Sequence, residues 1–352
     1  MQSRILSMSD FAQIKNVWSV CFGDSDAFID AYFQYATQPE NGRAYFDEDG
    51  KILSDMFGLD FAVNLTGNRY DTKFLAGCAT MPAARKKDLM KNLVRDALGD
   101  YKRQGYAVAM LHPFLHSFYR KFGFETIAYV DRREAQGVGG DEAVVADGFD
   151  ALPVGKMMQA YADYTGRFDN YFVRDARRFD AWLRLLFADD GKVAYIDDGE
   201  DGFAYALYYE HQSHTEVFEL VCPNEGHLDK IIRSLPPKKV QYFLPAMPGA
   251  GEEFTMLRVL DPVTALRKYP YADGAGGFTI EIADDFLEAD YKLAVSREKD
   301  GGLEVLPVQG GCDIRADMAS LSSLIAGAGG NNMPAIAQEA FPLKKSCFFE
   351  TY

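Results

Sequence analysis

The sequence predicts a mixed α/β fold, of the α+β kind, that is divided into more than one domain. Its 352 residues exceed what one ordinary core holds, because domains contain roughly 100–200 residues. Strand-like apolar runs and stretches of helical spacing follow one another along the chain. The composition is 48% hydrophobic and 25% charged, which is typical of a globular protein.

The first elements are two helices and a hairpin. Ser9-Asp10 is a helix start, apolar residues then recur every three or four positions, and Gly23 ends the helix. A second helix with the same spacing is expected at 28–33. Residues 43–63 are expected to form two strands joined by a tight Asp-Gly turn.

A strand and a long helix follow. The strand at 72–81 stops at Pro82, because proline cannot donate to a sheet ladder. Residues 86–103 then carry one apolar stripe, which predicts a strongly amphipathic helix. The rest of this region is expected to contain a buried strand at 106–111, a short helix at 117–121 and a strand at 124–130.

The remainder of the chain divides at a glycine-rich stretch, residues 133–148. The middle region is expected to contain a helix at 171–187, a hairpin at 191–212 and a strand-turn-helix unit at 215–235. That unit weakly repeats the strand and helix that follow residue 72. A third region starts near residue 256, and it is expected to contain three strands and a helix up to 327 and a further helix at 331–341.

The charge and the cysteines limit the possible partners. The net charge of −15 repels phosphate backbones, so we expect no nucleic-acid partner. The same charge would attract cationic small molecules such as amines, although it could also serve solubility alone. The five cysteines form no Cys-x-x-Cys pair, which argues against a disulfide framework and a zinc site.

The chain contains no apolar run near the ~20 residues that a membrane span needs, and we expect no membrane partner. Its start, "MQSRILSMSDF", lacks the apolar core of a signal peptide. These features predict a soluble protein of the cytoplasm.

Three segments carry a resemblance to a known family: the strand "LAGCATMP", the following "ARKKDLMKNL", and "FYRKFGFE". Together they resemble the GNAT family of acetyl-CoA-dependent N-acetyltransferases. The three-part chain is similar to the Eis-like members of that family. The resemblance implies a GNAT domain at 1–136, a degenerate GNAT-like domain at 137–253 and a sterol-carrier-like domain at 254–352. It also implies a homo-oligomer.

The resemblance places the acetyl-CoA pyrophosphate at the N-terminus of the helix near Arg85, where unpaired N–H groups attract anions. Lys86 and Lys87 add positive charge, although a solvated basic helix end would look the same. Asp88 departs from the family pattern, which has glycine there. Two like charges ~4 Å apart repel by about 1–4 kcal/mol. The expected cofactor-binding residues are Ala79, Thr80, Met81, Arg85, Lys86, Lys87, Asp88, Leu89 and Met90.

The resemblance also assigns two catalytic groups. Tyr119 corresponds to the general acid, which gives a proton or a hydrogen bond to the departing thiolate. The carboxylate of Tyr352 corresponds to the general base, acting through water or on an already neutral amine. The backbone around Ala79 to Met81 would bind the oxyanion. Alternatively, Tyr119 anchors a short helix, and the apolar ending "CFFETY" only docks in the core.

Metal binding is not expected. His112 and His116 are four residues apart, a spacing that can place two ligands on one helix face. Pro113 disfavours helix at His112, and no acid lies nearby in the sequence to complete a site.

The expected function is transfer of acetyl from acetyl-CoA to a primary amine of a polyamine, an aminoglycoside or a lysine side chain. The alternative is a non-catalytic binding protein, in which Asp88 has impaired the CoA loop and the third domain holds an apolar ligand. Acyl transfer from a different acyl-CoA is a third possibility.

Overall fold

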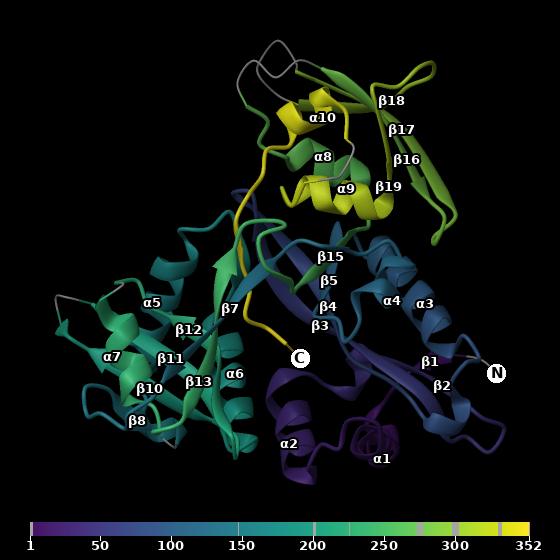
Figure 1. Cartoon of the computed structure of the whole chain (residues 1–352). Coiled ribbons are helices and arrows are strands. Elements are labelled where there is room, and N and C mark those ends of the chain that lie inside the picture. Colours follow the sequence, from purple (N-terminus) through teal and green to yellow (C-terminus); the bar gives the residue numbers. More distant parts are fainter. Residues whose placement is uncertain are drawn as a thin grey trace.

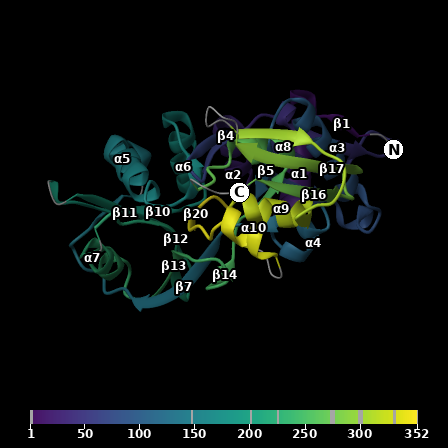
Figure 2. The same ribbon diagram turned by 90° about the horizontal axis from the view of Figure 1, so that it is seen from above.

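The computed structural model describes residues 3–146, 148–199, 202–224, 226–272, 277–297, 303–329 and 333–351. These residues form three β-sheets with helices packed on their faces (Figure 1). The second sheet lies to one side of the first, and the third lies above the first in this view. Figure 2 shows the C-terminal segment between the first and second sheets.

The first sheet has the strand order β1-β2-β3-β4-β5-β15-β6, and β9 and β20 extend it beside β3. Its strands are β1 (Ser3–Ile5), β2 (Gly42–Phe46), β3 (Ile52–Leu65), β4 (Asn68–Thr80), β5 (Val108–Leu111), β6 (Glu125–Thr126), β9 (Asn170–Val173), β15 (Met256–Val259) and β20 (Ser346–Cys347). Its helices and helical turns are η1 (Met8–Asp10), α1 (Phe11–Phe22), α2 (Asp26–Ala31), η2 (Tyr32–Ala36), η3 (Pro39–Asn41), η4 (Pro82–Ala84), α3 (Leu89–Arg103) and α4 (His116–Arg120).

The two faces of this sheet are covered by different helices. On one face, Trp18 of α1 packs against Phe57 of β3. On the other, Leu93 and Leu98 of α3 share a core with Met56, the residue before Phe57 in β3. Adjacent strand residues point to opposite faces, so α1 and α3 enclose the sheet as two layers.

The second sheet has the order β14-β7-β13-β12-β11-β10-β8. Its strands are β7 (Tyr129–Gln136), β8 (Val144–Ala146), β10 (Lys192–Asp197), β11 (Phe203–Glu210), β12 (His214–Val221), β13 (Lys239–Ala246) and β14 (Glu252–Glu253). Its helices are η5 (Phe149–Ala151), α5 (Val154–Thr165), α6 (Ala176–Ala188) and α7 (Gly226–Ser234). The unit β12–α7–β13 has the same parallel crossover as β4–α3–β5, which confirms the internal repeat.

The third sheet has the order β18-β17-β16-β19. Its elements are α8 (Pro262–Lys268), β16 (Phe278–Asp284), β17 (Ala289–Arg297), β18 (Leu303–Pro307), β19 (Ile314–Asp317), α9 (Met318–Ile325) and α10 (Ala335–Ala340). Rings of Tyr269, Tyr271, Phe278 and Phe341 lie in mutual contact in its core. None of the helices in the described part of the chain is long and apolar enough to cross a bilayer.

Several predicted boundaries were wrong because strands are exchanged between sheets. The run 124–130 is not one strand: β6 ends at Thr126 and stays in the first sheet, whereas β7 belongs to the second. β15 falls in the predicted third domain, but it pairs with β5 and β6 of the first sheet. The expected helix at 171–187 begins as β9, and α6 starts only at Ala176.

One of these exchanged strands is held by a buried ion pair. Arg258 of β15 contacts both carboxylate oxygens of Asp284 at 2.6 and 2.7 Å, and the two side chains are 0% and 2% exposed. Arg258 also donates to the carbonyl oxygen of Phe122. Gly123 has a φ of +80°, and a Cβ there would overlap the Arg258 guanidinium. Both the left-handed backbone and the contact with Arg258 therefore require glycine at this position.

Replacing this glycine should unfold the protein more easily. We expect Gly123→Ala to lower the free energy of unfolding by about 2–4 kcal/mol, because a left-handed backbone and an overlap with Arg258 both oppose the methyl group. Gly50→Ala is the control, since Gly50 has a φ of +77° but open space where a Cβ would stand. Urea unfolding measures both. Equal losses in the two variants would contradict the role of Arg258.

Candidate functional site

An opening between two parallel strands defines the candidate site. β4 and β5 pair from Thr72–Val108 to Leu75–Leu111, where β5 ends. β4 continues to Thr80 without β5 beside it. At this point β4 bulges, because the register of its ladder with β3 shifts between the pairs of Ala76 and Ala79. A parallel pair that separates exposes the unpaired backbone groups of the longer strand.

The backbone of Thr80 is directed toward this opening. The Met81 N–H donates to the carbonyl oxygen of Leu53 in β3 at 2.9 Å. Successive residues of a strand direct their backbone groups to opposite sides, so the Thr80 N–H points away from β3. Within the predicted trio Ala79 to Met81, Thr80 therefore has the N–H that a ligand in the opening could reach.

The loop after β4 has a left-handed backbone at two residues. Lys86 has a φ of +64° and Asp88 a φ of +56°, so both adopt a conformation that favours glycine. Consequently α3 starts at Leu89 and not near Arg85 as predicted. The side chain of Asp88 does not cap the helix and leaves the N–H groups of its first turn to another partner. Such a loop and helix start can hold a phosphate.

Tyr119 lies at the other side of the opening. Its side chain is 4% exposed, and its hydroxyl interacts with the thiol of Cys78 in the unpaired stretch of β4. Burial raises the pKa of Tyr119 well above its usual value, and Cys78 adds to this effect. Burial also raises the pKa of the Cys78 thiol to about 12. Both groups are therefore protonated at neutral pH.

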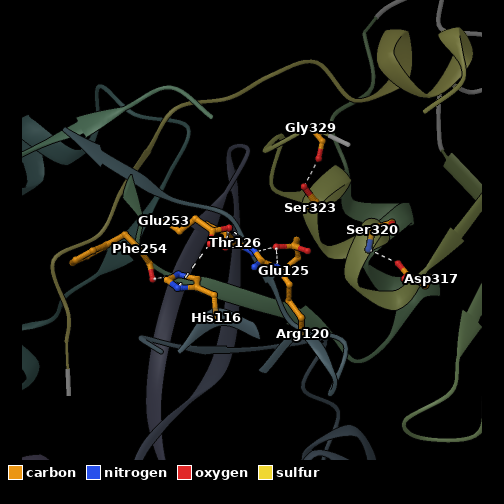
Figure 3. A network of polar contacts seen from close by, with 10 residues as sticks. All are labelled: His116, Arg120, Glu125, Thr126, Glu253, Phe254, Asp317, Ser320, Ser323 and Gly329. Carbon is orange, nitrogen blue, oxygen red and sulfur yellow. Dashed lines mark hydrogen bonds and ion pairs between the residues drawn. The ribbon is translucent and has the colours of Figure 1, made fainter. Parts of the chain in front are cut away.

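A polar network holds the helix that carries Tyr119 (Figure 3). Arg120 donates to Glu125 at 2.9 Å and to Thr126 at 3.1 Å, and Thr126 donates to Glu253 at 3.0 Å. On the same helix, Nε2 of His116 lies 3.3 Å from the Phe254 carbonyl oxygen. α4 is thus fixed to β6 and to the chain before β15, which limits the movement of Tyr119.

A cavity of about 590 Å³ adjoins the opening. Phe114, which follows β5, lines it, and its ring centroid lies 5.8 Å from that of Tyr119. The wall combines aromatic and acidic side chains from elements around the first and second sheets, and Thr351 of the C-terminal segment adds to it. Its aromatic and acidic residues are Phe28, Phe114, Trp182, Tyr209, Phe218, Phe243, Phe254, Asp189, Glu216, Glu252 and Glu253.

The acids of this cavity differ in their partners. Arg132 contacts Glu252 at 3.1 Å, and Arg120 pairs with Glu253. For Asp189, burial raises the pKa, and a hydrogen bond from Tyr209 lowers it. Burial and the charge of Asp189 likewise raise the pKa of Asp24 in the loop before α2. A cation bound beside Asp189 would relieve this repulsion.

His112 contributes a neutral imidazole to the same cavity. Burial, with a smaller effect of His116, lowers its pKa to about 4. Its ring centroid lies 4.5 Å from that of Phe254. Among the described residues, none forms a hydrogen bond with its buried Nδ1. Sequence reasoning assigned no role to His112, and the structure places it as a polar group of the cavity wall.

The C-terminal segment is buried between the first two sheets. β20 pairs in parallel with β9, and Phe348 and Phe349 are each 4% exposed. Glu350 is 1% exposed and accepts from Arg174 at 2.7 Å. Thr351 reaches the wall of the 590 Å³ cavity. Tyr352, the predicted base, lies outside the described residues.

Arg174 holds two buried carboxylates. Besides Glu350 it contacts both oxygens of Glu219, at 2.9 and 2.8 Å. Trp182 and Tyr205 also donate to Glu219, at 2.8 and 2.6 Å. The side chains of Arg174, Glu219 and Glu350 are each at most 1% exposed. These charges are therefore strongly coupled and poorly hydrated.

Among the predicted site residues, Tyr119 lies beside the unpaired end of β4. The loop 85–88 and the start of α3 follow that end in the chain. Sequence reasoning missed Cys78, the acids of the cavity and the ion cluster of Arg174. The cavity acids come from separate elements, and no spacing along the chain could have connected them.

The first part of the chain matches a known family model. Residues 2–127 match the family model of the acetyltransferase (GNAT) domain. A search of curated proteins finds no match.

Solved structures match the fold of the whole chain. One is a probable N-acyltransferase of unknown function from Enterococcus faecalis V583, with a TM-score of 0.77 and 14% identity, covering 100% of this chain and 99% of that one. Another is a GCN5-related N-acetyltransferase from Anabaena variabilis, with a TM-score of 0.77 and 16% identity over 100% of both chains. Eis1 from Mycobacterium abscessus has a TM-score of 0.70 and 18% identity over 100% of both chains.

Removing the shared cation should destabilise the protein strongly. We expect Arg174→Ala to lower the free energy of unfolding by about 3–5 kcal/mol, because two buried carboxylates lose their partner. Glu350→Gln leaves the Arg174–Glu219 contact in place and should cost less. Arg132→Ala, at an exposed pair, should cost under about 1 kcal/mol. Chemical denaturation of the three variants tests this order, and equal losses for Arg174→Ala and Arg132→Ala would refute it.

Proposed function

Because residues 2–127 match the GNAT acetyltransferase domain and the whole chain has the fold of Eis1, we propose that this protein transfers acetyl from acetyl-CoA to a primary amine of a cationic acceptor. The acceptor class includes polyamines, aminoglycosides and lysine side chains. The observation that carries the proposal is the placement of the Tyr119 hydroxyl in the opening between β4 and β5, beside an aromatic and acidic cavity.

The cofactor residues fit acetyl-CoA. The left-handed loop at Lys86 and Asp88 and the uncapped start of α3 offer N–H groups to a pyrophosphate. Arg85, Lys86 and Lys87 are exposed and add positive charge. The thioester would then extend along the unpaired part of β4, where the Thr80 N–H could donate to the developing oxyanion.

Tyr119 would act on the departing sulfur. Because its pKa is raised, complete proton transfer to a thiolate of pKa about 8.5 is uphill, and a hydrogen bond to the thiolate is the more favourable role. The raised pKa of Cys78 argues against a thiolate that would accept the acetyl group. We therefore favour direct attack of the amine on the thioester carbon.

The acceptor would bind in the 590 Å³ cavity. Aromatic faces attract ammonium groups, and Asp189 with Asp24 would gain from a nearby cation. We retain the carboxylate of Tyr352 as the proposed base, which receives the amine proton through water. Support for this assignment comes from Thr351, the preceding residue, which lines the cavity. An oligomeric assembly stays a prediction.

Asp88 keeps the binding-protein alternative open. Its carboxylate, near the proposed pyrophosphate position, could weaken CoA binding. The left-handed conformation at Asp88 costs about 1–2 kcal/mol for an ordinary side chain, and somewhat less for Asp. Glycine would remove both the strain and the charge.

The titration of acetyl-CoA into the protein tests cofactor binding. We expect saturable binding by the wild type and about tenfold tighter binding by Asp88→Gly, since one repulsive charge is removed. Asp190→Gly is the control: Asp190 also has a left-handed φ, of +58°, but it follows α6, away from this loop. Binding that appears only in Asp88→Gly would favour the non-catalytic protein.

Tyr119→Phe tests the catalytic assignment. Loss of a hydrogen bond to a thiolate should lower kcat by about 10–150-fold with little change in the KM for acetyl-CoA, as expected for about 1.5–3 kcal/mol. Tyr106→Phe is the control. It also removes a tyrosine hydroxyl, whose 3.0 Å hydrogen bond to Asp60 lies away from the opening. An unchanged kcat in Tyr119→Phe would refute the assignment of Tyr119 as the acid. Full activity after deletion of Tyr352 would refute the assignment of its carboxylate as the base.

A further inference from the structure

The turn between β11 and β12 gathers three residues that bind metals well. His211, His214 and Glu216 each offer one ligand atom, and these atoms lie within 4.8 Å of one another. Nε2 of His211 is 3.1 Å from Oε2 of Glu216, and the two imidazole centroids are 4.7 Å apart. Ligands of a tetrahedral zinc ion are separated by about 3.4 Å, so small side-chain rotations would complete the site.

The backbone around this cluster is fixed. The His211 N–H donates to the His214 carbonyl oxygen at 2.9 Å, which closes the turn. Glu216 pairs with Tyr209 across the hairpin, and His214 pairs with Lys239 of β13. His214 and Glu216 are two residues apart on β12, so their side chains share one face of the strand. The fold, and not the metal, therefore brings the ligands together.

The nearby lysines are neutralised by other carboxylates. Lys238 donates to the His211 carbonyl oxygen at 3.1 Å, and its ammonium group lies 3.7 Å from Glu210. Lys239 pairs with Glu134 at 2.6 Å. Within the described ranges, Glu216 forms its ion pair with His211 and not with a lysine or an arginine. A divalent cation at the cluster would therefore interact with the Glu216 carboxylate, and the neighbouring lysine ammonium groups would repel it only weakly.

We propose that His211, His214 and Glu216 bind a divalent transition-metal ion, with Zn²⁺ as the best match. Two imidazoles and one carboxylate are a donor set that zinc accepts, and three protein ligands leave a fourth position for water. This site is separate from the opening between β4 and β5. The spacing within "HQSHTE" did not predict it, because the three ligands meet only across the tight turn.

The site also has a consequence for the cavity, which rests on the proposed function. Glu216 lines the 590 Å³ cavity. A metal ion would take up its carboxylate, and the cavity would then have one charge fewer to attract a cationic acceptor. Zinc should therefore raise the KM for the acceptor and leave the KM for acetyl-CoA unchanged.

Calorimetric titration of Zn²⁺ into the chelator-treated full chain, without substrates, tests the site itself. We expect one ion per chain with micromolar affinity, and a loss of at least about 30-fold in His211→Ala and in His214→Ala. Gln212→Ala is the matched control, because Gln212 is exposed in the same turn and is not one of the three ligands, and it should bind within about threefold of the wild type. The visible spectrum of the Co²⁺ form should show a tetrahedral centre.

Two results would overturn the proposal: no saturable binding, or binding that His211→Ala and His214→Ala leave intact, which would place the ion elsewhere. The effect on the cavity is tested by acceptor KM with and without Zn²⁺ in the wild type and in His211→Ala, which keeps Glu216. If Zn²⁺ does not change the KM for the acceptor, the proposed effect of the metal on the cavity is refuted, but the metal site is not. Absence of transferase activity would refute the proposed function, and the calorimetry would still decide the metal site.

Discussion

The contact of Arg174 with two buried carboxylates determines how the parts of this molecule fit together. Arg174 directly follows β9 of the first sheet, Glu219 belongs to the second sheet, and Glu350 belongs to the C-terminal segment. One cation among two anions leaves a buried excess of negative charge, and the donors Trp182 and Tyr205 offset part of it. Buried ion clusters contribute little net stability, but they tolerate few alternative geometries. This contact therefore links both sheets to the segment that leads to the cavity.

The candidate site depends on where strands end more than on unusual side chains. β5 ends after four residue pairs with β4, and the backbone groups of β4 beyond that point can bind another molecule. Tyr119 and Cys78 lie beside this gap, and both remain protonated because desolvation raises their pKa values. The acidic cavity is assembled around the same point from elements far apart in the chain. In the proposed function, this scaffold separates cofactor binding at the loop after β4 from acceptor binding beside the second sheet.

The sequence was most informative where the signal is local. The long amphipathic helix now seen as α3, the strand ended by Pro82 and the short helix of Tyr119 all follow from periodicity and from proline or glycine. The start of α3 was misplaced because nothing in the residue types of Lys86 and Asp88 indicates a left-handed backbone. The sequence also could not predict that β7 joins the second sheet and β15 the first, since the residue pattern of a strand does not indicate which strand it pairs with. The same reason hid Glu219 and Glu350, which look like ordinary surface acids until tertiary packing buries them.

The position of β15 has a consequence for synthesis. This strand lies in the interior of the first sheet, between β5 and β6, yet the ribosome makes it only after the whole second sheet. Until then the nascent first domain has an open edge at β5, with backbone groups that can pair with another chain. Domains that emerge first usually fold first, but this one has to wait for a strand that is encoded beyond the second sheet. Messages truncated anywhere before that strand would yield chains with an exposed sheet edge, and chaperones would have to shield it.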